Sequence, residues 1–327
     1  MSKFKIIKFK NLSPLHIGLG RNNYDFSSSI LHSDTISAAL ASIRACNGKS
    51  KDIEQFLSSF AMSSAFPYFK DAIYLPLPKG RLNIRIQGRS ENEIRKQLKK
   101  LQYAELSMWE QMAKGECLEI QENQIMGYYL NSPNKLYNNN FIKRQLTERV
   151  TVPTGDNKTA VPFFFEWTFF SKEAGLYVIV DAADEIFEEL ISLTKELGVN
   201  GIGSDRNVGG GHFEITAEEM SIDVPQNANS QMLLSLFIPD KEELSYLDLK
   251  EAQYSLIQRG GFIAGSNVNS FRHLRRKSIY MFEEGSIFPT SKQLRGRVVD
   301  LAPSWNDKNM HKVLRSGKPF TLPTNFK

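Results

Sequence analysis

The chain has 327 residues and a mass of 37.2 kDa, and 41% of its residues are hydrophobic, which is enough to fill the cores of two ordinary domains. It contains two cysteines, Cys46 and Cys117, which excludes a disulfide framework and a paired-cysteine metal site. The net charge of +5 suits a polyanionic partner, but 41 basic residues against 36 acidic ones is a modest excess that does not decide the function.

The N-terminus alternates charged and apolar residues and lacks the apolar core of a signal peptide. The sequence also has no run of 18 apolar residues. We therefore expect a cytoplasmic protein without a membrane partner.

The first predicted elements are a strand, a loop and a helix. Residues 4–10 alternate as in a half-buried strand, and 11–20 form a loop containing Pro14 and two glycines. A helix follows, with Ser33 or Asp34 as its N-cap and with Ile36, Leu40 and Ile43 on one face. The N-terminus of such a helix is a plausible seat for a phosphate group.

Residues 56–77 are apolar and interrupted by prolines, which predicts a short helix and a strand around 73–75. Ser90 and Glu93 then form the pattern of a capping box, which predicts one helix that continues to Gly115. Its apolar stripe would consist of Ile94, Leu98, Leu101, Met108 and Met112. The lysines and arginines at 95–100 are typical of the solvated face of a helix. Residues 131–140 are rich in Asn and show no pattern.

A β-hairpin is predicted at 143–152 and 160–170, two runs of β-formers that bracket the turn PTGDNKT. Four cations lie on this projecting element: Lys143, Arg144, Arg149 and Lys158. They either contact a partner or only solubilise an exposed hairpin. A further strand is expected at 176–181.

The most unusual stretch is 198–214, GVNGIGSDRNVGGGHFE, where the five glycines from Gly201 to Gly211 surround Arg206. A helix with Ile186, Leu190, Leu193 and Leu197 on one face precedes it, and Gly198 stands where a C′ glycine would end that helix. A short strand at 212–216 follows. Rossmann and Walker loops need a strand before the glycines and a helix after them, so both are excluded. The glycines either let the backbone approach a phosphate chain or only link two elements.

Without insertions the order is βαββαβ, which predicts an α+β fold with a ferredoxin-like (RRM-like) domain at 1–220, the glycine-rich loop, and an inserted helical and hairpin segment at about 78–162. We expect a second, β-rich ferredoxin-like domain at 221–327, with strands at 232–238, 254–263, 277–282 and 297–301. The basic run Arg272–Lys277 in a loop of this domain is either a binding patch or a solvated loop.

Several segments together resemble the RAMP superfamily of CRISPR proteins, and within it the family of the fourth Csm subunit of type III-A effector complexes. They are LSPLHIGLG, HSDTISAAL, GIGSDRNVGGGHFEI, GGFIAG, KSIYMFEEGSIF and HKVLRSGKPFTLP, and they span nearly the whole chain.

The resemblance implies a noncatalytic, RNA-binding subunit of a ribonucleoprotein that serves antiviral defence and holds the 5′ tag of the crRNA. It implies docking to the large polymerase-like subunit and to a backbone RAMP subunit, indirect contact with target RNA, and a hairpin that acts as a thumb, with 152–161 at its tip. No cofactor, metal or catalytic residue is expected. The expected RNA-binding residues are His16, Gly18, Arg21, Ser33, Thr35, Lys143, Arg144, Arg149, Lys158, Gly201, Gly203, Ser204, Arg206, Asn207, Gly209, Gly210 and Gly211.

Physical reasoning agrees with this, since single-stranded RNA is held by amides and cations on its phosphates and by side chains beside its bases. The amides would come from the glycine loop, with His16, Ser33 and Thr35 on the same side.

Two rival functions stay open. A metal-independent CRISPR endoribonuclease could use His16 or His32 as a general base, although no complete acid and base pair is evident. A nucleotide-dependent enzyme would need a Walker lysine and a magnesium-binding acid, for which Asp205 alone is poor evidence. His212, His273 and His311 are too scattered to indicate a metal site.

Overall fold

The computed structural model describes residues 1–18, 24–88, 91–137, 140–151, 159–263, 266, 268–303 and 310–326. Its centre is a sheet in which β13, β1, β12 and β3 are neighbours in that order, each antiparallel to the next. The bounds are β1 Ser2–Lys10, β3 Phe66–Phe69, β12 Ala174–Ala182 and β13 Glu214–Ile222. The predicted strands at 4–10 and 176–181 are confirmed, and the one expected at 212–216 is longer.

The central strand β1 is buried on both faces. Consecutive residues Ile6 and Ile7 are 1% and 0% exposed, and they belong to two different apolar clusters. The alternation predicts a strand with one buried face and one exposed face. This prediction is wrong for the middle of β1, because both faces of the sheet are covered there.

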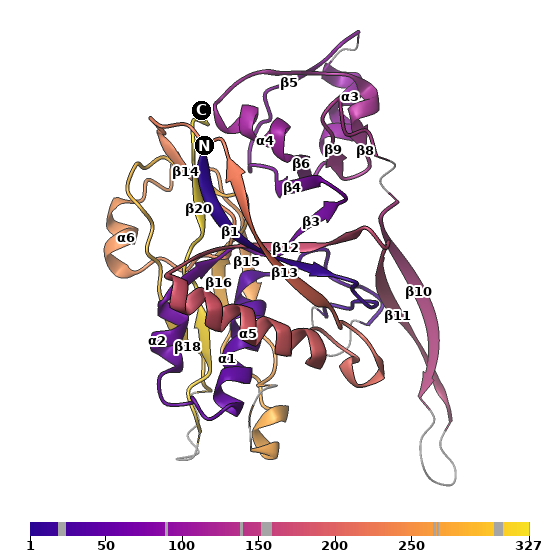
Figure 1. Cartoon of the computed structure of the whole chain (residues 1–327), viewed down its shortest axis with the longest axis vertical. Helices are drawn as coiled ribbons and strands as arrows, with labels where there is room; N and C mark the ends of the chain where they lie inside the picture. The colour runs from indigo at the N-terminus through magenta and orange to yellow at the C-terminus, as the bar shows by residue number, and fades with distance from the viewer. Residues whose placement is uncertain are drawn as a thin grey trace.

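Two helices cover one face: α1 (Ser33–Cys46) and α5 (Asp184–Asn200) (Figure 1). Ile36 and Leu40 of α1 pack in one cluster with Leu190 of α5 and with Ile7. The N-cap of α1 is His32, which makes no side-chain capping bond, so the predicted cap at Ser33 or Asp34 is wrong. The strand β4 (Ala72–Pro76) confirms the strand expected around 73–75, whereas the short helix α2 (Ile53–Ser58) lies earlier than expected and overlaps the predicted range only at 56–58.

The long helix predicted from Ser90 to Gly115 is wrong. The chain instead forms α3 (Glu91–Leu98), the strand β6 (Tyr103–Glu105) and α4 (Leu106–Ala113), because β6 pairs with β4 and with β9 (Tyr129–Leu130). Gly115 does end α4, in a left-handed conformation (φ 80°). Residue 90, the predicted cap, lies outside the described residues. The other short elements here are β2 Phe60–Met62, β5 Ile84–Ile86, β7 Leu118–Ile120, η1 Glu122–Gln124 and β8 Ile125–Met126.

The predicted hairpin is confirmed as β10 (Ile142–Thr151) and β11 (Val161–Phe170), paired along their length from Ile142↔Phe170 to Thr151↔Val161. It projects from the body of the molecule (Figure 1). Residues 152–158, which contain most of the predicted turn, lie outside the described residues.

The C-terminal part is a set of small sheets. Its elements are β14 Ser230–Leu233, α6 Lys241–Tyr246, β15 Leu256–Arg259, η3 Asn269–His273, β16 Ile279–Phe282, β17 Ile287–Phe288, β18 Val298–Asp300, β19 Leu314–Ser316 and β20 Thr321–Thr324. They pair as β17-β14-β20, β15-β16 and β18-β19. The expectation of a second ferredoxin-like domain is not met within the described ranges, which hold no second four-stranded sheet covered by two helices. Met232 and Leu322 share a cluster with Ile6, so this part covers the face of the sheet opposite α1 and α5.

Candidate nucleic-acid interface

The glycine loop begins where α5 ends, three residues later than the sequence predicts. Asn200 is the last helical residue, and Gly201 (φ 75°) is the C-cap. Gly198, the predicted end of the helix, is buried inside it, and a Cβ on Gly198 would lie 2.2 Å from the Phe213 carbonyl oxygen. Its small size therefore serves close packing of the helix on the strand that follows the loop.

Two glycines of the loop fit against other parts of the protein. A Cβ on Gly203 (φ 90°) would lie 2.4 Å from the His16 carbonyl oxygen, and one on Gly211 (φ 70°) would lie 1.8 Å from the Ile202 carbonyl oxygen. Gly209 (φ 91°) differs, because a Cβ there would meet no atom within 4 Å. Only around Gly209 is the space next to the backbone open.

Most amides that the sequence assigns to phosphate groups are used inside the protein. Those amides belong to Gly203, Ser204, Gly209, Gly210 and Gly211. Four of them donate to carbonyl oxygens: Ser204 to His16 (2.9 Å), Gly209 to Arg206 (3.2 Å), Gly210 to Asp205 (3.0 Å) and Gly211 to Pro14 (2.9 Å). The expectation that these four amides hold phosphates is therefore wrong for the loop as it is folded. The exposed part of the loop is its tip, formed by Arg206, Asn207, Val208 and Gly209. In the part of the chain that the structure describes, Arg206 forms no ion pair.

His16 lies beneath the loop and is 1% exposed. Its Nδ1 is 2.8 Å from the Glu166 carbonyl oxygen, and its ring centroid is 4.3 Å from that of Phe165. Its Nε2 is buried and has no hydrogen-bond partner. Gly18 forms an isolated antiparallel bridge with Ser27, and the Ser28 amide donates to the Ile17 carbonyl oxygen, so residues 27–28 lie beside residues 17–18.

The base of the hairpin is joined to the loop. Arg149 of β10 forms an ion pair with Asp205, and its guanidinium lies 4.1 Å from the ring centroid of Phe165 and 5.4 Å from that of Trp167. Trp167 also packs against Gly210, where a Cβ would come within 2.8 Å of the indole. The glycine loop, the segment around His16 and the base of the hairpin thus form one surface, which we call the loop–hairpin surface.

The hairpin cations do not all lie together. Side chains alternate across a strand, so Lys143 and Arg149 share the face of the loop whereas Arg144 lies on the other face, 5.7 Å from the ring of Phe26. Lys158 and Arg21 lie outside the described residues.

Ser33 and Thr35 are not part of the loop–hairpin surface. The Ser33 hydroxyl is buried and accepts from the Leu236 amide (3.0 Å), and the Thr35 hydroxyl accepts from Arg259 (2.8 Å). The C-terminal part therefore covers the N-terminus of α1, and the expectation that these two residues face the glycine loop is wrong.

The basic run Arg272–Lys277 separates into two kinds of residue. Arg276 is 7% exposed, whereas Arg272, His273, Arg275 and Lys277 are exposed. Arg276 is therefore not part of a solvated loop, and a buried arginine within a basic run leaves no signal in composition. Sequence reasoning also missed Arg259 and Arg315, which lie with it.

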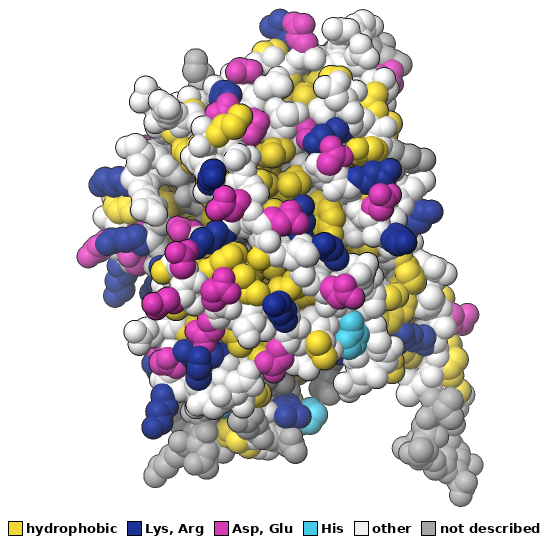
Figure 2. Space-filling view, in the orientation of Figure 1, with side chains coloured by type: hydrophobic (Ala, Val, Ile, Leu, Met, Phe, Trp, Pro, Cys, Tyr) yellow, Lys and Arg dark blue, Asp and Glu magenta, His cyan; other side chains and the backbone are white. Residues whose placement is uncertain are grey.

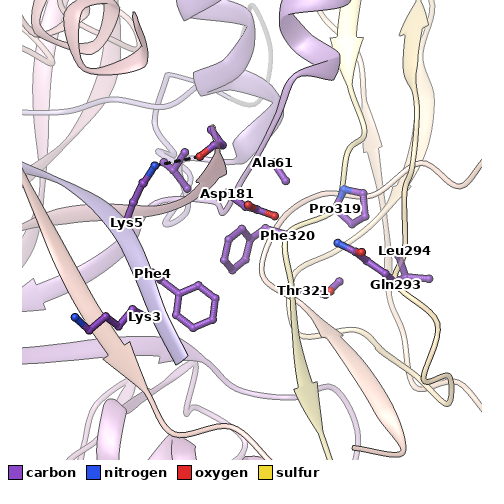
Figure 3. A pocket seen from close by; sticks show the side chains of 12 residues that line it. Lys3, Phe4, Lys5, Ala61, Asp181, Gln293, Leu294, Pro319, Phe320 and Thr321 are labelled. Atoms are coloured by element: carbon purple, nitrogen blue, oxygen red, sulfur yellow. Dashed lines mark hydrogen bonds between the residues drawn. The ribbon is translucent and has the colours of Figure 1, made fainter. Parts of the chain in front are cut away.

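A cavity of about 280 Å³ lies between the sheet and the C-terminal part (Figure 3), lined in part by Lys5, Asp181 and Phe320. Lys5 donates from Nζ to the Ala182 carbonyl oxygen at 3.2 Å. None of the predicted site residues lines this cavity. Among the described residues there is also no group of three or more His, Cys, Asp or Glu side chains that could hold a metal ion.

Charge on the face shown in Figure 2 is mixed, with basic and acidic side chains interspersed. The +5 net charge is therefore not gathered into a basic patch on this side. No helix of the described ranges is long and apolar enough to cross a membrane.

Comparison with known proteins shows what the chain is similar to. Residues 226–324 match the family model of the CRISPR Csm4 C-terminal domain. The chain is 27% identical to Csm4 of Streptococcus thermophilus over 333 aligned positions, covering 97% of each protein. It is 30% identical to Csm4 of Mycobacterium tuberculosis over 167 positions, which cover 50% of this chain and about half (52%) of that relative.

Solved structures have the same fold. A Csm1–Csm4 cassette in complex with cA4 matches with a TM-score of 0.63 and 20% identity, covering 100% of this chain and 99% of the other. A Csm3–Csm4 subcomplex of the type III-A CRISPR-Cas interference complex matches with a TM-score of 0.63 and 19% identity over 98% and 99% of the two chains.

The chain shares its mixed α+β fold with the Csm4 subunits of these solved structures. Together with the sequence matches, this makes the chain a Csm4-like CRISPR protein, as the resemblance seen in the sequence indicates.

Proposed function

We propose that this chain is the noncatalytic RNA-binding subunit of a type III-A Csm complex, where it holds the 5′ tag of the crRNA. It would dock the large polymerase-like subunit, the part played by Csm1 in the related cassette, and a backbone subunit such as Csm3. In this proposal β1, α1, β12, α5 and β13 belong to a ferredoxin-like unit that presents the glycine loop, and the hairpin is the thumb.

The observation that carries the proposal is the loop–hairpin surface. Asp205 holds Arg149 and Gly210 packs on Trp167, so the glycine loop and the hairpin base are fixed relative to each other. The exposed tip then offers the cation of Arg206, with open space beside Gly209 in which a ligand can approach. A phosphate chain bound to this surface can contact the loop and the hairpin at once, as sequence-independent binders of single strands do.

The test is to co-express the chain with its genomic neighbours, purify the assembly and sequence the bound RNA. Arg206→Gln should lower RNA affinity about tenfold, since a hydrogen bond to a charged group contributes roughly 1.5 kcal/mol. Lys195→Gln is the matched control, because Lys195 is exposed on α5 and the change in charge is the same. An assembled Arg206→Gln complex with unchanged RNA content would contradict the proposal.

The rival endoribonuclease function is less well supported by the histidines. His16 and His32 are 1% and 3% exposed, and His32 Nδ1 lies 2.9 Å from a Glu284 carboxylate oxygen. A general base must reach the 2′-hydroxyl of its substrate, which neither ring does here. We expect the isolated chain not to cleave RNA; cleavage that disappears in His16→Ala would establish the rival function instead.

A further inference from the structure

A group of three arginines that shares one carboxylate lies between α1 and the C-terminal part, with Arg276 buried and the other two half-buried. It consists of Arg259 at the end of β15, Arg276 before β16 and Arg315 in β19, and we call it the arginine cluster. The one carboxylate in it is Asp34, in the first turn of α1 and 0% exposed. Arg259 donates to both Asp34 oxygens, at 2.8 and 3.2 Å.

That ion pair uses the whole charge of Asp34, and two arginines remain. Arg276 donates from one Nη to the Gly260 carbonyl oxygen at 2.6 Å, while its Nε and other Nη are buried and have no hydrogen-bond partner. The Nε of Arg315 is also buried without a partner. Among the described residues, no second carboxylate acts on Arg276 or Arg315.

The protonation behaviour of the cluster agrees with this geometry. Burial, together with Arg315 and Arg259 as positive neighbours, lowers the pKa of Arg276 to about 10. Arg276 nevertheless stays protonated at neutral pH. Burial by itself would raise the pKa of the Asp34 carboxyl, but Arg259 and Arg315 together hold it below its ordinary value.

Buried charges without counter-ions are costly, and proteins pair them or bind an ion of the opposite sign. Three guanidinium nitrogens without a partner, on two neighbouring arginines, are donors of the kind with which arginine binds phosphate oxygens. The start of α1 contributes a positive helix end on the same side.

We propose that the arginine cluster is a phosphate-binding site, and that the phosphate belongs to RNA bound by this subunit. The source of the phosphate rests on the proposed function, whereas the phosphate chemistry does not. The site is formed by both parts of the chain, with Asp34 and Thr35 from α1 and the arginines from the C-terminal part. A phosphate bound there would hold the two parts together.

The first test measures Tm of the full chain in inorganic phosphate and in chloride at equal ionic strength. Phosphate should raise Tm by about 5 °C at a hundredfold excess over Kd. Arg276→Met should abolish this specific gain and should not lower Tm in chloride, because it removes a buried charge that has no counter-ion. Lys277→Met, one residue away and exposed, is the control for net charge and should keep the gain.

A purely structural role predicts the opposite pattern. Arg276→Met would then lower Tm in chloride, and phosphate would raise Tm equally in all three proteins, as a general salt effect does; that result overturns the proposal. If Arg276→Met fails to fold, a ³¹P NMR titration of the wild-type chain decides, with Arg276→Lys as the comparison. Loss of phosphate line broadening in Arg276→Lys supports the site, and equal or absent broadening in both rejects it.

The second test adds a single-stranded RNA oligonucleotide. RNA should compete with inorganic phosphate, and in Arg276→Met the slope of log K against log salt should fall by about 0.7, the value for one phosphate contact on a single strand. If the protein binds RNA but RNA does not remove the rise in Tm caused by phosphate, then RNA is not the source of the phosphate group bound at the cluster. If phosphate raises Tm but the protein binds no RNA, the proposed function is wrong and the phosphate site is still supported.

Discussion

Asp205 determines how the glycine loop and the hairpin are held together. Among the residues that the structure describes, it is one of three other than glycine with positive φ (56°), and its carboxylate pairs with Arg149. Asparagine tolerates the left-handed conformation, so Asp205→Asn removes the charge without adding backbone strain. The substitution therefore isolates the ion pair.

We expect Asp205→Asn to lower the free energy of unfolding by only about 0.2–1 kcal/mol, since both side chains are about one-third exposed. RNA binding should strengthen at low salt and its salt dependence should steepen, because Arg149 is no longer neutralised. Urea denaturation and filter binding at several salt concentrations measure the two effects. Weaker RNA binding in this variant would mean that Asp205 itself contacts the RNA.

The two kinds of glycine in the loop give a second prediction, at the scale of the element. Gly211→Ala should cost more than about 3 kcal/mol of unfolding free energy, because its Cβ would overlap the Ile202 carbonyl oxygen. Gly209→Ala meets no atom and should cost about 1 kcal/mol, the strain of a left-handed alanine. Denaturant titration of both variants checks the difference, and equal losses would contradict the loop geometry described here.

The hairpin gives a third prediction. Thr151 and Val161 are paired opposite each other, so a two-residue Asn-Gly turn can replace residues 152–160 without changing the register. We expect the shortened protein to fold, to dock its partner subunits and to keep its RNA. If the tip displaces a nucleotide, chemical probing of the bound RNA should show one position near the 5′ tag becoming protected. An unchanged reactivity pattern would mean that the tip does not contact that nucleotide.

Sequence patterns predicted the elements whose signal is local. Periodicity and turn residues predict β1, α1, the hairpin and the order of α5, glycine loop and β13, and tertiary contacts do not override these local signals. The helix expected up to Gly115 failed because Tyr103–Glu105 is pulled into a sheet by β4 and β9, strands that are distant in sequence. The five glycines of the loop are compatible in sequence with close approach of a phosphate chain or with a simple link, yet in the fold Gly203 and Gly211 face the protein's own carbonyl oxygens. Contacts of that kind depend on the tertiary fold and cannot be predicted from the spacing of glycines along the sequence.

At the scale of the whole molecule, buried polar groups join α1 to the C-terminal part. Asp34 pairs with Arg259, and the adjacent His32 pairs with Glu284, which also accepts from the Ser64 hydroxyl. Burial alone would raise the pKa of the Glu284 carboxyl, but the His32 charge and these hydrogen bonds hold it below 4.5, its ordinary value. Two carboxylates with lowered pKa values therefore lie at the junction of the two parts.

This gives a pH dependence with a definite sign. A carboxyl whose pKa is lowered by folding contributes stability that is present above its unfolded value and is lost as the pH falls through its folded value. The ordinary values are 3.8 for Asp34 and 4.5 for Glu284, so stability should be steady above about pH 5 and should fall below it. Urea denaturation between pH 7 and pH 3, in phosphate-free buffers, measures this acid limb.

Asp34→Asn tests which of the two carboxylates causes most of the loss of stability at low pH. The substitution leaves all three arginines of the cluster without a buried counter-charge, so it should cost about 3–5 kcal/mol at pH 7. It should also flatten the acid limb, because the residue no longer titrates. Asp181→Asn is the control, since Asp181 is exposed on β12 and should change neither quantity. If the arginine cluster binds phosphate, adding phosphate should restore more stability to Asp34→Asn than to the wild type, because the anion then supplies the charge that the carboxylate had provided. An acid limb in Asp34→Asn as steep as in the wild type would assign the pH dependence to Glu284 or to other carboxylates.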